Sequence, residues 1–163
     1  MRLRWVCSSL VGIAMLLVTV AQTVACTGIT LVAADGSVVR GRTLEFGQPM
    51  DSDVILIPRG LAYTGTTPDG EAKGLHWTAK YAAAGANGDG LPVLVDGLNE
   101  KGLSGGIFYF PGFAGYQTIA ASQEARALAP WELLSWALTS FATIDEVRAA
   151  LPTIRVGTVT LAA

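Results

Sequence analysis

The sequence predicts an α+β fold in which strands come first and helices follow. Short runs rich in β-branched residues, separated by Gly, Asn, Asp and Pro, occupy most of residues 27–110. Between residues 130 and 151, apolar residues recur instead at spacings of three and four. The 163 residues contain no internal repeat and no linker of low complexity. We therefore expect one globular domain behind a removable leader.

Residues 1–25 have the pattern of a signal peptide. Arg2 and Arg4 give a positive start, an apolar run covers residues 10–20, and small residues precede Cys26. The run is shorter than the roughly 20 residues that span a bilayer, so a permanent anchor is the less favoured alternative. We expect cleavage before Cys26, which predicts a periplasmic or secreted product without membrane attachment.

A bacterial lipoprotein is a further alternative, because Cys26 directly follows a small residue, as in a lipobox. Thr23 stands where that motif wants Leu, which disfavours this interpretation. The distinction matters because acylation of the Cys26 amine would remove its basicity.

The first strands after the leader predict a hairpin. Residues 27–33 and 38–44 are rich in β-branched residues, and Ala34-Asp35-Gly36-Ser37 supplies turn residues between them. The second strand would bring Arg42 back near Cys26.

The later elements follow from the same patterns. Further strands are expected over residues 53–58, 77–84, 91–97 and 103–110, a loop over 65–74, and turns over 86–90 and 98–102. Pro130 opens a helix that runs to Phe141, and Thr143 with Glu146 forms a capping box that opens a second helix. Residues 155–161 return to strand character.

Composition and motifs exclude several function classes. Eleven basic and thirteen acidic residues give a net charge of −2 with no basic block, so we expect no nucleic-acid partner. With His76 as the single histidine, neither a Ser-His-Asp triad nor a histidine-rich metal site can be built. The motif GxxxxGK[ST] does not occur. We expect neither a cofactor nor a metal.

An N-terminal Cys26 would carry a nucleophile and a base on one residue. An α-amino group has a pKa of about 7.7–8.0, so near neutral pH it can accept the thiol proton. Arg42 near the sulfur would favour the thiolate, and the Glu45 carboxylate could orient the amine. The competing interpretation makes Cys26 a buried packing residue and the other two ordinary surface charges.

Several short motifs in order resemble the choloylglycine hydrolase family, which contains bile salt hydrolases and penicillin V acylases. These motifs are Cys26-Thr27-Gly28, Asp35-Gly36, Gly41-Arg42-Thr43-Leu44-Glu45, Ile57-Pro58-Arg59, Asp96-Gly97-Leu98-Asn99-Glu100-Lys101-Gly102-Leu103, Phe110-Pro111-Gly112, Ala129-Pro130-Trp131-Glu132 and Phe141-Ala142-Thr143. The resemblance extends from Cys26 to about Leu161.

The resemblance implies an N-terminal nucleophile hydrolase with an αββα sandwich, which cleaves linear amide bonds through a thioester on its first cysteine. Residues 26–163 would form the N-terminal part of such a domain. By resemblance Cys26 is nucleophile and base, Arg42 lies beside the sulfur, and Glu45 stands where many members carry Asp near the α-amine.

The resemblance also bears on the substrate. Tyr109 stands where penicillin V acylases carry a tyrosine and bile salt hydrolases often an asparagine at the oxyanion hole, which favours an acylase. Leu44 and Phe46 are candidates for the lining of an acyl pocket. The expected partner is a small-molecule amide, and a homo-oligomer is left open.

Members of this family are longer than this chain. The asparagine and arginine of their later half have no positions here, so we expect an incomplete sandwich with exposed sheet edges. Two functions remain open: an exported amidase, or a truncated, non-catalytic exported or lipid-anchored protein that retains the β scaffold.

Overall fold

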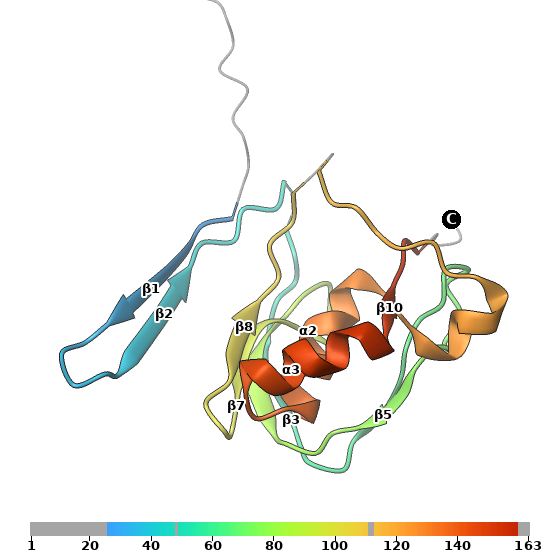
Figure 1. The fold of residues 1–163 in the computed structure, drawn as a ribbon. Coiled ribbons are helices and arrows are strands. Elements are labelled where there is room, and N and C mark those ends of the chain that lie inside the picture. Colours follow the sequence, from blue (N-terminus) through green and yellow to red (C-terminus); the bar gives the residue numbers. More distant parts are fainter. Residues whose placement is uncertain (1–25, 48, 111–112, 160–163) are drawn as a thin grey trace, which may run out of the picture.

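The computed structural model describes residues 26–47, 49–110 and 113–159 (Figure 1). The predicted signal peptide lies outside these residues. Within the described ranges, no helix has the length and apolar character needed to cross a membrane.

An antiparallel sheet of four strands forms the centre of the molecule. Its strand order is β3-β6-β7-β8, with β3 at Val54–Ile57, β6 at Ala83–Asn87, β7 at Leu94–Asn99 and β8 at Ser104–Gly106. All three neighbouring pairs are antiparallel, and the register shifts between Ala86 and Asn87.

Three strand pairs lie outside this sheet. They are the hairpin of β1 (Gly28–Val32) with β2 (Val38–Arg42), the hairpin of β4 (Ala62–Thr64) with β5 (His76–Thr78), and the parallel pair of β9 (Ala127–Leu128) with β10 (Arg155–Val156). The β1–β2 hairpin projects away from the body of the molecule (Figure 1). Its turn contains Gly36 at a φ of 83°, which glycine adopts without strain.

The helices follow the strands, as the α+β prediction requires. A 3₁₀ turn at Pro130–Glu132 leads into α2 (Leu133–Ser140), and α3 spans Ile144–Ala150. Further 3₁₀ segments occupy Ala121–Arg126 and Leu151–Thr153. The Thr143 hydroxyl accepts a hydrogen bond from the Glu146 backbone N–H at 3.2 Å, which confirms the predicted cap.

Helix α2 covers one face of the four-stranded sheet. Leu134 and Leu138 of α2 pack in one core cluster with Ile57 of β3, Ala83 of β6 and Leu94 of β7. A Cβ on Gly105 would meet the Leu134 side chain at 2.6 Å, so this face of β8 lies against the helix. The alternation of side chains along a strand then directs Gly106 to the opposite face.

The opposite face of the sheet is largely uncovered. Val54 and Leu56 of β3 are 87% and 73% exposed, and Leu98 of β7 is 54% exposed. The base of the β1–β2 hairpin contacts this face at one corner, where Arg40 of β2 pairs with Asp96 of β7. The layers are therefore helix, sheet and, at that corner, a second pair of strands.

Two buried polar residues of the sequence motifs tie the helices to the strands. The side-chain amide of Asn99 donates hydrogen bonds to the carbonyls of Leu138 and Phe141 at 2.8 and 2.7 Å. The Glu132 carboxylate accepts hydrogen bonds from the backbone N–H groups of Ala129 and Thr66 at 2.8 and 2.9 Å. The polar atoms of both side chains are therefore hydrogen-bonded within the protein, as buried polar groups generally are.

The predicted strand at residues 77–84 differs from the structure. The chain forms β5, leaves strand geometry over 79–82 and then enters β6, which continues through Asn87 into the segment predicted as a turn. Pairing of β6 with β3 and β7 on both sides extends this Ala- and Gly-rich strand beyond what its intrinsic propensity indicates. The strand predicted at 103–110 is likewise shorter and ends at Gly106. Of the strand predicted at 155–161, the described part, which stops at residue 159, forms strand β10 at Arg155 and Val156.

We expect Leu94→Ala to lower the free energy of unfolding by about 2–5 kcal/mol, because Leu94 is fully buried and its truncation leaves a cavity. Leu56→Ala, at an exposed position on the opposite face of the sheet, is the matched control. It should change the free energy of unfolding by no more than about 0.5 kcal/mol. Urea unfolding followed by circular dichroism measures both. Equal effects would contradict the assignment of the core to the helix-facing side.

The Arg59–Glu100 ion pair should make stability depend on pH. Arg59 hydrogen bonds and the Ala82 N–H lower the pKa of Glu100 to about 2, from an ordinary value of 4.5. Because the folded pKa is depressed, the contribution is complete above about pH 4.5 and is lost as the pH falls toward 2. The stability difference between wild type and Glu100→Gln should therefore shrink over this interval in acid unfolding curves. A difference independent of pH would exclude this contribution.

Candidate functional site

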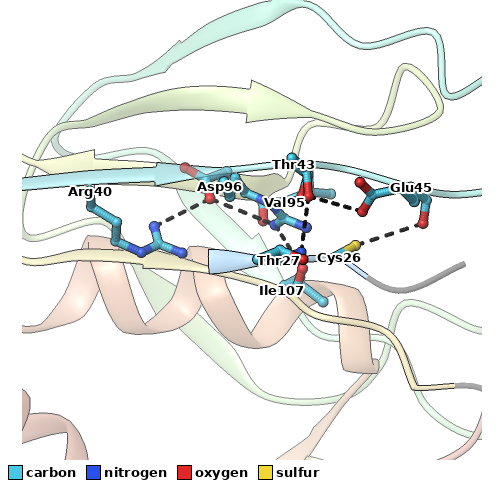
Figure 2. Close-up of polar contacts among 9 residues, drawn as sticks. Cys26, Thr27, Arg40, Thr43, Glu45, Val95, Asp96 and Ile107 are labelled. Carbon is cyan, nitrogen blue, oxygen red and sulfur yellow. Dashed lines mark hydrogen bonds and ion pairs between the residues drawn. The ribbon is translucent and has the colours of Figure 1, made fainter. Parts of the chain in front are cut away.

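The hairpin positions Cys26 beside the end of β2. Gly28 pairs with Arg42 in the hairpin register. Just beyond this pair, the Thr43 N–H donates to the Thr27 carbonyl at 2.9 Å, and the Thr27 N–H donates to the Thr43 hydroxyl at 3.0 Å. These two hydrogen bonds hold Cys26 at the base of the hairpin (Figure 2).

Cys26 and Glu45 are in contact, as Figure 2 shows. The Cys26 thiol donates to the Glu45 backbone carbonyl with a sulfur–oxygen distance of 3.7 Å. The Glu45 carboxylate accepts a hydrogen bond from the Thr43 hydroxyl at 3.0 Å. A short relay thus runs from the Thr27 N–H through the Thr43 hydroxyl to the Glu45 carboxylate. Cys26 is a partly exposed, free cysteine.

Arg42 is the most enclosed charge of the site, with a side chain only 9% exposed. Its Nη1 donates to the Ile107 carbonyl at 2.7 Å and to the Val95 carbonyl at 3.3 Å, while its Nε donates to the Thr43 carbonyl at 3.1 Å. The guanidinium carbon lies 4.5 Å from the centroid of the Phe108 ring, a cation–π distance. Strand β7 and the segment that directly follows β8 therefore bind a side chain that belongs to the hairpin.

The candidate pocket residues form a second group. The rings of Phe46 and Tyr109 lie with centroids 6.2 Å apart and an interplanar angle of 59°, a tilted arrangement that aromatic pairs favour. Tyr109 is 50% exposed and Leu44 is 43% exposed. The structure thus brings Tyr109 against Phe46, the residue that follows Glu45, and leaves Leu44 at the surface.

The sequence did not predict site roles for three polar residues, Thr43, Arg40 and Asp96. Asp96 lies 3.2 Å from Arg40 and 3.6 Å from Arg42. One signal was available, because an aspartate inside the apolar strand that precedes the turn at 98–102 is unusual. Its partners are more than fifty residues away in sequence and could not be read from local patterns.

Other chemistry is not assembled in the described part of the chain. No group of three or more His, Cys, Asp or Glu side chains is placed to hold a metal ion among these residues. His76 is the first residue of β5, where its Nδ1 lies 3.0 Å from the Thr64 hydroxyl. Cys26, Arg42 and Glu45 are thus the candidate reactive groups that the fold collects at one place.

A model of the linear amide C–N hydrolases of the choloylglycine hydrolase family matches residues 26–161. A bile salt hydrolase/transferase of Clostridium perfringens is 31% identical over 129 residues, which are 77% of this chain and 37% of that protein. A conjugated bile acid hydrolase of Lactobacillus gasseri is 29% identical over 131 residues, 79% of this chain and 39% of the relative.

Solved structures show the same fold. A variant of the conjugated bile acid hydrolase from Clostridium perfringens, with a cysteine replaced by alanine, superposes with a TM-score of 0.64 at 27% identity. The superposition covers 82% of this chain and 39% of the bile acid hydrolase. Penicillin V acylase from Agrobacterium tumefaciens gives a TM-score of 0.66 at 20% identity, over 80% of this chain and 40% of the acylase. These matches confirm the predicted N-terminal nucleophile hydrolase fold in its incomplete form, because this chain spans about two fifths of the length of these proteins.

We expect Thr43→Val to loosen the hairpin base while leaving its volume nearly unchanged. The substitution removes the acceptor of the Thr27 N–H and the donor to Glu45, and one such hydrogen bond contributes about 1 kcal/mol. Hydrogen exchange followed by NMR should show the Thr27 amide exchanging about fivefold faster. Thr30→Val, at an exposed position of β1, is the control; unchanged protection at Thr27 would contradict the relay.

Proposed function

The chain belongs to the choloylglycine hydrolase family of linear amide C–N hydrolases, and we propose that it is an exported hydrolase of a small-molecule amide with Cys26 as its nucleophile. The observation that carries this proposal is the convergence of Cys26, Arg42 and Glu45 at the base of one hairpin. The relatives support it. In two solved bile acid hydrolase variants, the substituted cysteine and arginine are sixteen positions apart, the same separation as Cys26 and Arg42.

The proposed reaction requires removal of the leader before Cys26. The freed α-amine accepts the thiol proton, and the thiolate attacks the carbonyl carbon of the amide. The C–N bond breaks, the proton passes to the leaving amine, and the acyl group remains on sulfur as a thioester. Water then attacks the thioester, releasing a carboxylic acid and restoring the thiol. The positive charge of Arg42 favours the thiolate during this cycle.

The aromatic pair of Phe46 and Tyr109 supports an aromatic acyl group, as in penicillin V, over the steroid acyl group of a bile salt. A ring that packs against this pair gains about 0.5–1.5 kcal/mol beyond the area it buries. We propose that this pair forms one wall of the acyl pocket, with Leu44 at its exposed rim.

A non-catalytic role is the second candidate. The observation that favours it is the coverage of only 37–40% of the relatives' length. In this case an exported or lipid-anchored protein would keep the sheet and hairpin without the activity of its longer relatives.

The test is expression of the chain from Met1, followed by N-terminal sequencing, intact mass and assays of penicillin V and conjugated bile salts. We expect a product that begins at unmodified Cys26 and releases the amine of penicillin V, with turnover falling to the uncatalysed background in Cys26→Ser. Cys7→Ser, within the predicted leader, is the matched control and should change neither the mature mass nor the turnover.

An acylated Cys26 or a retained leader would refute the proposed mechanism. A correctly processed product without turnover on any of these amides would instead favour the non-catalytic scaffold.

A further inference from the structure

Two arginines of the hairpin share one carboxylate of the sheet. Arg40 and Arg42 are alternate residues of β2 and therefore point to the same face. The Nη1 atom of Arg40 lies 3.2 Å from Asp96 Oδ2, and that of Arg42 lies 3.6 Å from the same oxygen. The three side chains are 21%, 9% and 31% exposed, so the cluster is largely shielded from water. Figure 2 shows the contact between Arg40 and Asp96.

The sheet makes room for this cluster at Gly106. Gly106 pairs with Asp96 in the register of β7 and β8. A Cβ at Gly106 would overlap Arg40 Nη2 and Asp96 Oδ2, and would lie 3.1 Å from Arg42 Nη1. A larger residue would therefore force the two arginines and the carboxylate apart.

The hydrogen bonds of Arg42 leave one nitrogen unused. Its Nε and Nη1 donate to the carbonyls of Thr43, Ile107 and Val95. Among the described residues, its Nη2 is buried and has no hydrogen-bond partner. One edge of the guanidinium is thus held by the protein while Nη2 retains its hydrogen-bonding capacity.

The charges of the cluster do not cancel. Two guanidinium groups face one carboxylate, and the shorter contact of Asp96 is with Arg40. Interaction between charges falls with distance, so Asp96 neutralises Arg40 more completely than Arg42. Arg42 keeps part of its positive charge while remaining anchored.

We propose that Asp96 is a positioning residue that holds the Arg42 guanidinium in the orientation in which it stabilises the Cys26 thiolate. Arg40 supplies the compensating charge, and Gly106 supplies the space. The inference rests on the proposed function, in which Cys26 reacts as a thiolate, and extends it to a carboxylate on another strand. Glu45 is the charged residue whose backbone carbonyl contacts the Cys26 thiol, and among the described residues none of its hydrogen bonds is to the cluster.

The test measures the reactivity of Cys26 directly, without turnover. The purified chain is alkylated with iodoacetamide across a pH series, and modification of the Cys26 peptide is quantified by mass spectrometry. The double variant Arg40→Gln with Asp96→Asn removes the ionic contact between Asp96 and Arg42 and leaves the net charge of the cluster unchanged. We expect the midpoint of the pH profile to rise by at least about 0.5 pH units, a threefold loss of thiolate below the midpoint.

The same double substitution in an Arg42→Gln background is the control, and it should shift the midpoint little because the positioned group is gone. A folded double variant with an unchanged or lowered midpoint would overturn the proposal, as would an equal rise in the Arg42→Gln background. Gly106→Ala provides an independent variant that disturbs the same contacts, and it should raise the midpoint as well; circular dichroism reports folding in each case.

The outcome is separable from that of the proposed function. If the chain hydrolyses no amide but gives the expected alkylation profiles, the proposed hydrolase activity is refuted and the role of Asp96 is supported. If the chain hydrolyses an amide but its alkylation profile is the same with and without Asp96, the hydrolase activity is supported and the role of Asp96 is refuted.

Discussion

The binding of the Arg42 guanidinium by β7 and by the segment after β8 is the interaction that fixes the hairpin to the body of the molecule. The β1–β2 hairpin projects from the body (Figure 1), and its side chains bury little surface of their own. Arg42 joins it to the carbonyls of Val95 and Ile107 and to the ring of Phe108. Because Arg42 pairs with Gly28 in the hairpin register, these contacts also fix where Cys26 lies relative to the sheet.

Much of the family pattern in the sequence is structural rather than chemical. Asn99 ends β7 and binds the last carbonyls of α2, while its own Oδ1 accepts from Lys101 and Leu103 in the turn. Glu132 caps the start of the helical segment and binds Thr66 in a distant loop. These contacts fix α2 against the sheet, and the sheet in turn presents Asp96 and Ile107 to the hairpin. The motif residues around the site thus build its support.

Local chemistry made some elements predictable from the sequence alone. The first hairpin follows from its turn residues and β-branched flanks, and α3 follows from Thr143 and Glu146, which interact within one turn of chain. The division between β5 and β6 was not predictable, because pairing with β3 and β7 determines where that Ala- and Gly-rich segment is extended. The site divides in the same way. Cys26, Arg42 and Glu45 lie within one hairpin and were found, whereas Asp96 joins them only through the tertiary fold.

The two faces of the β1–β2 hairpin resemble the interior of a protein. Ile29, Leu31 and Val39 lie on one face, Val32 and Val38 on the other, and each is between 57% and 69% exposed. Strands with covered faces on both sides have this composition, and the outer edges of β1 and β2 have no strand partner in the described residues. Such a ribbon is a template on which further strands can add. Pairing with a second chain along these edges would be a bimolecular step, so its extent would rise with the concentration of the chain.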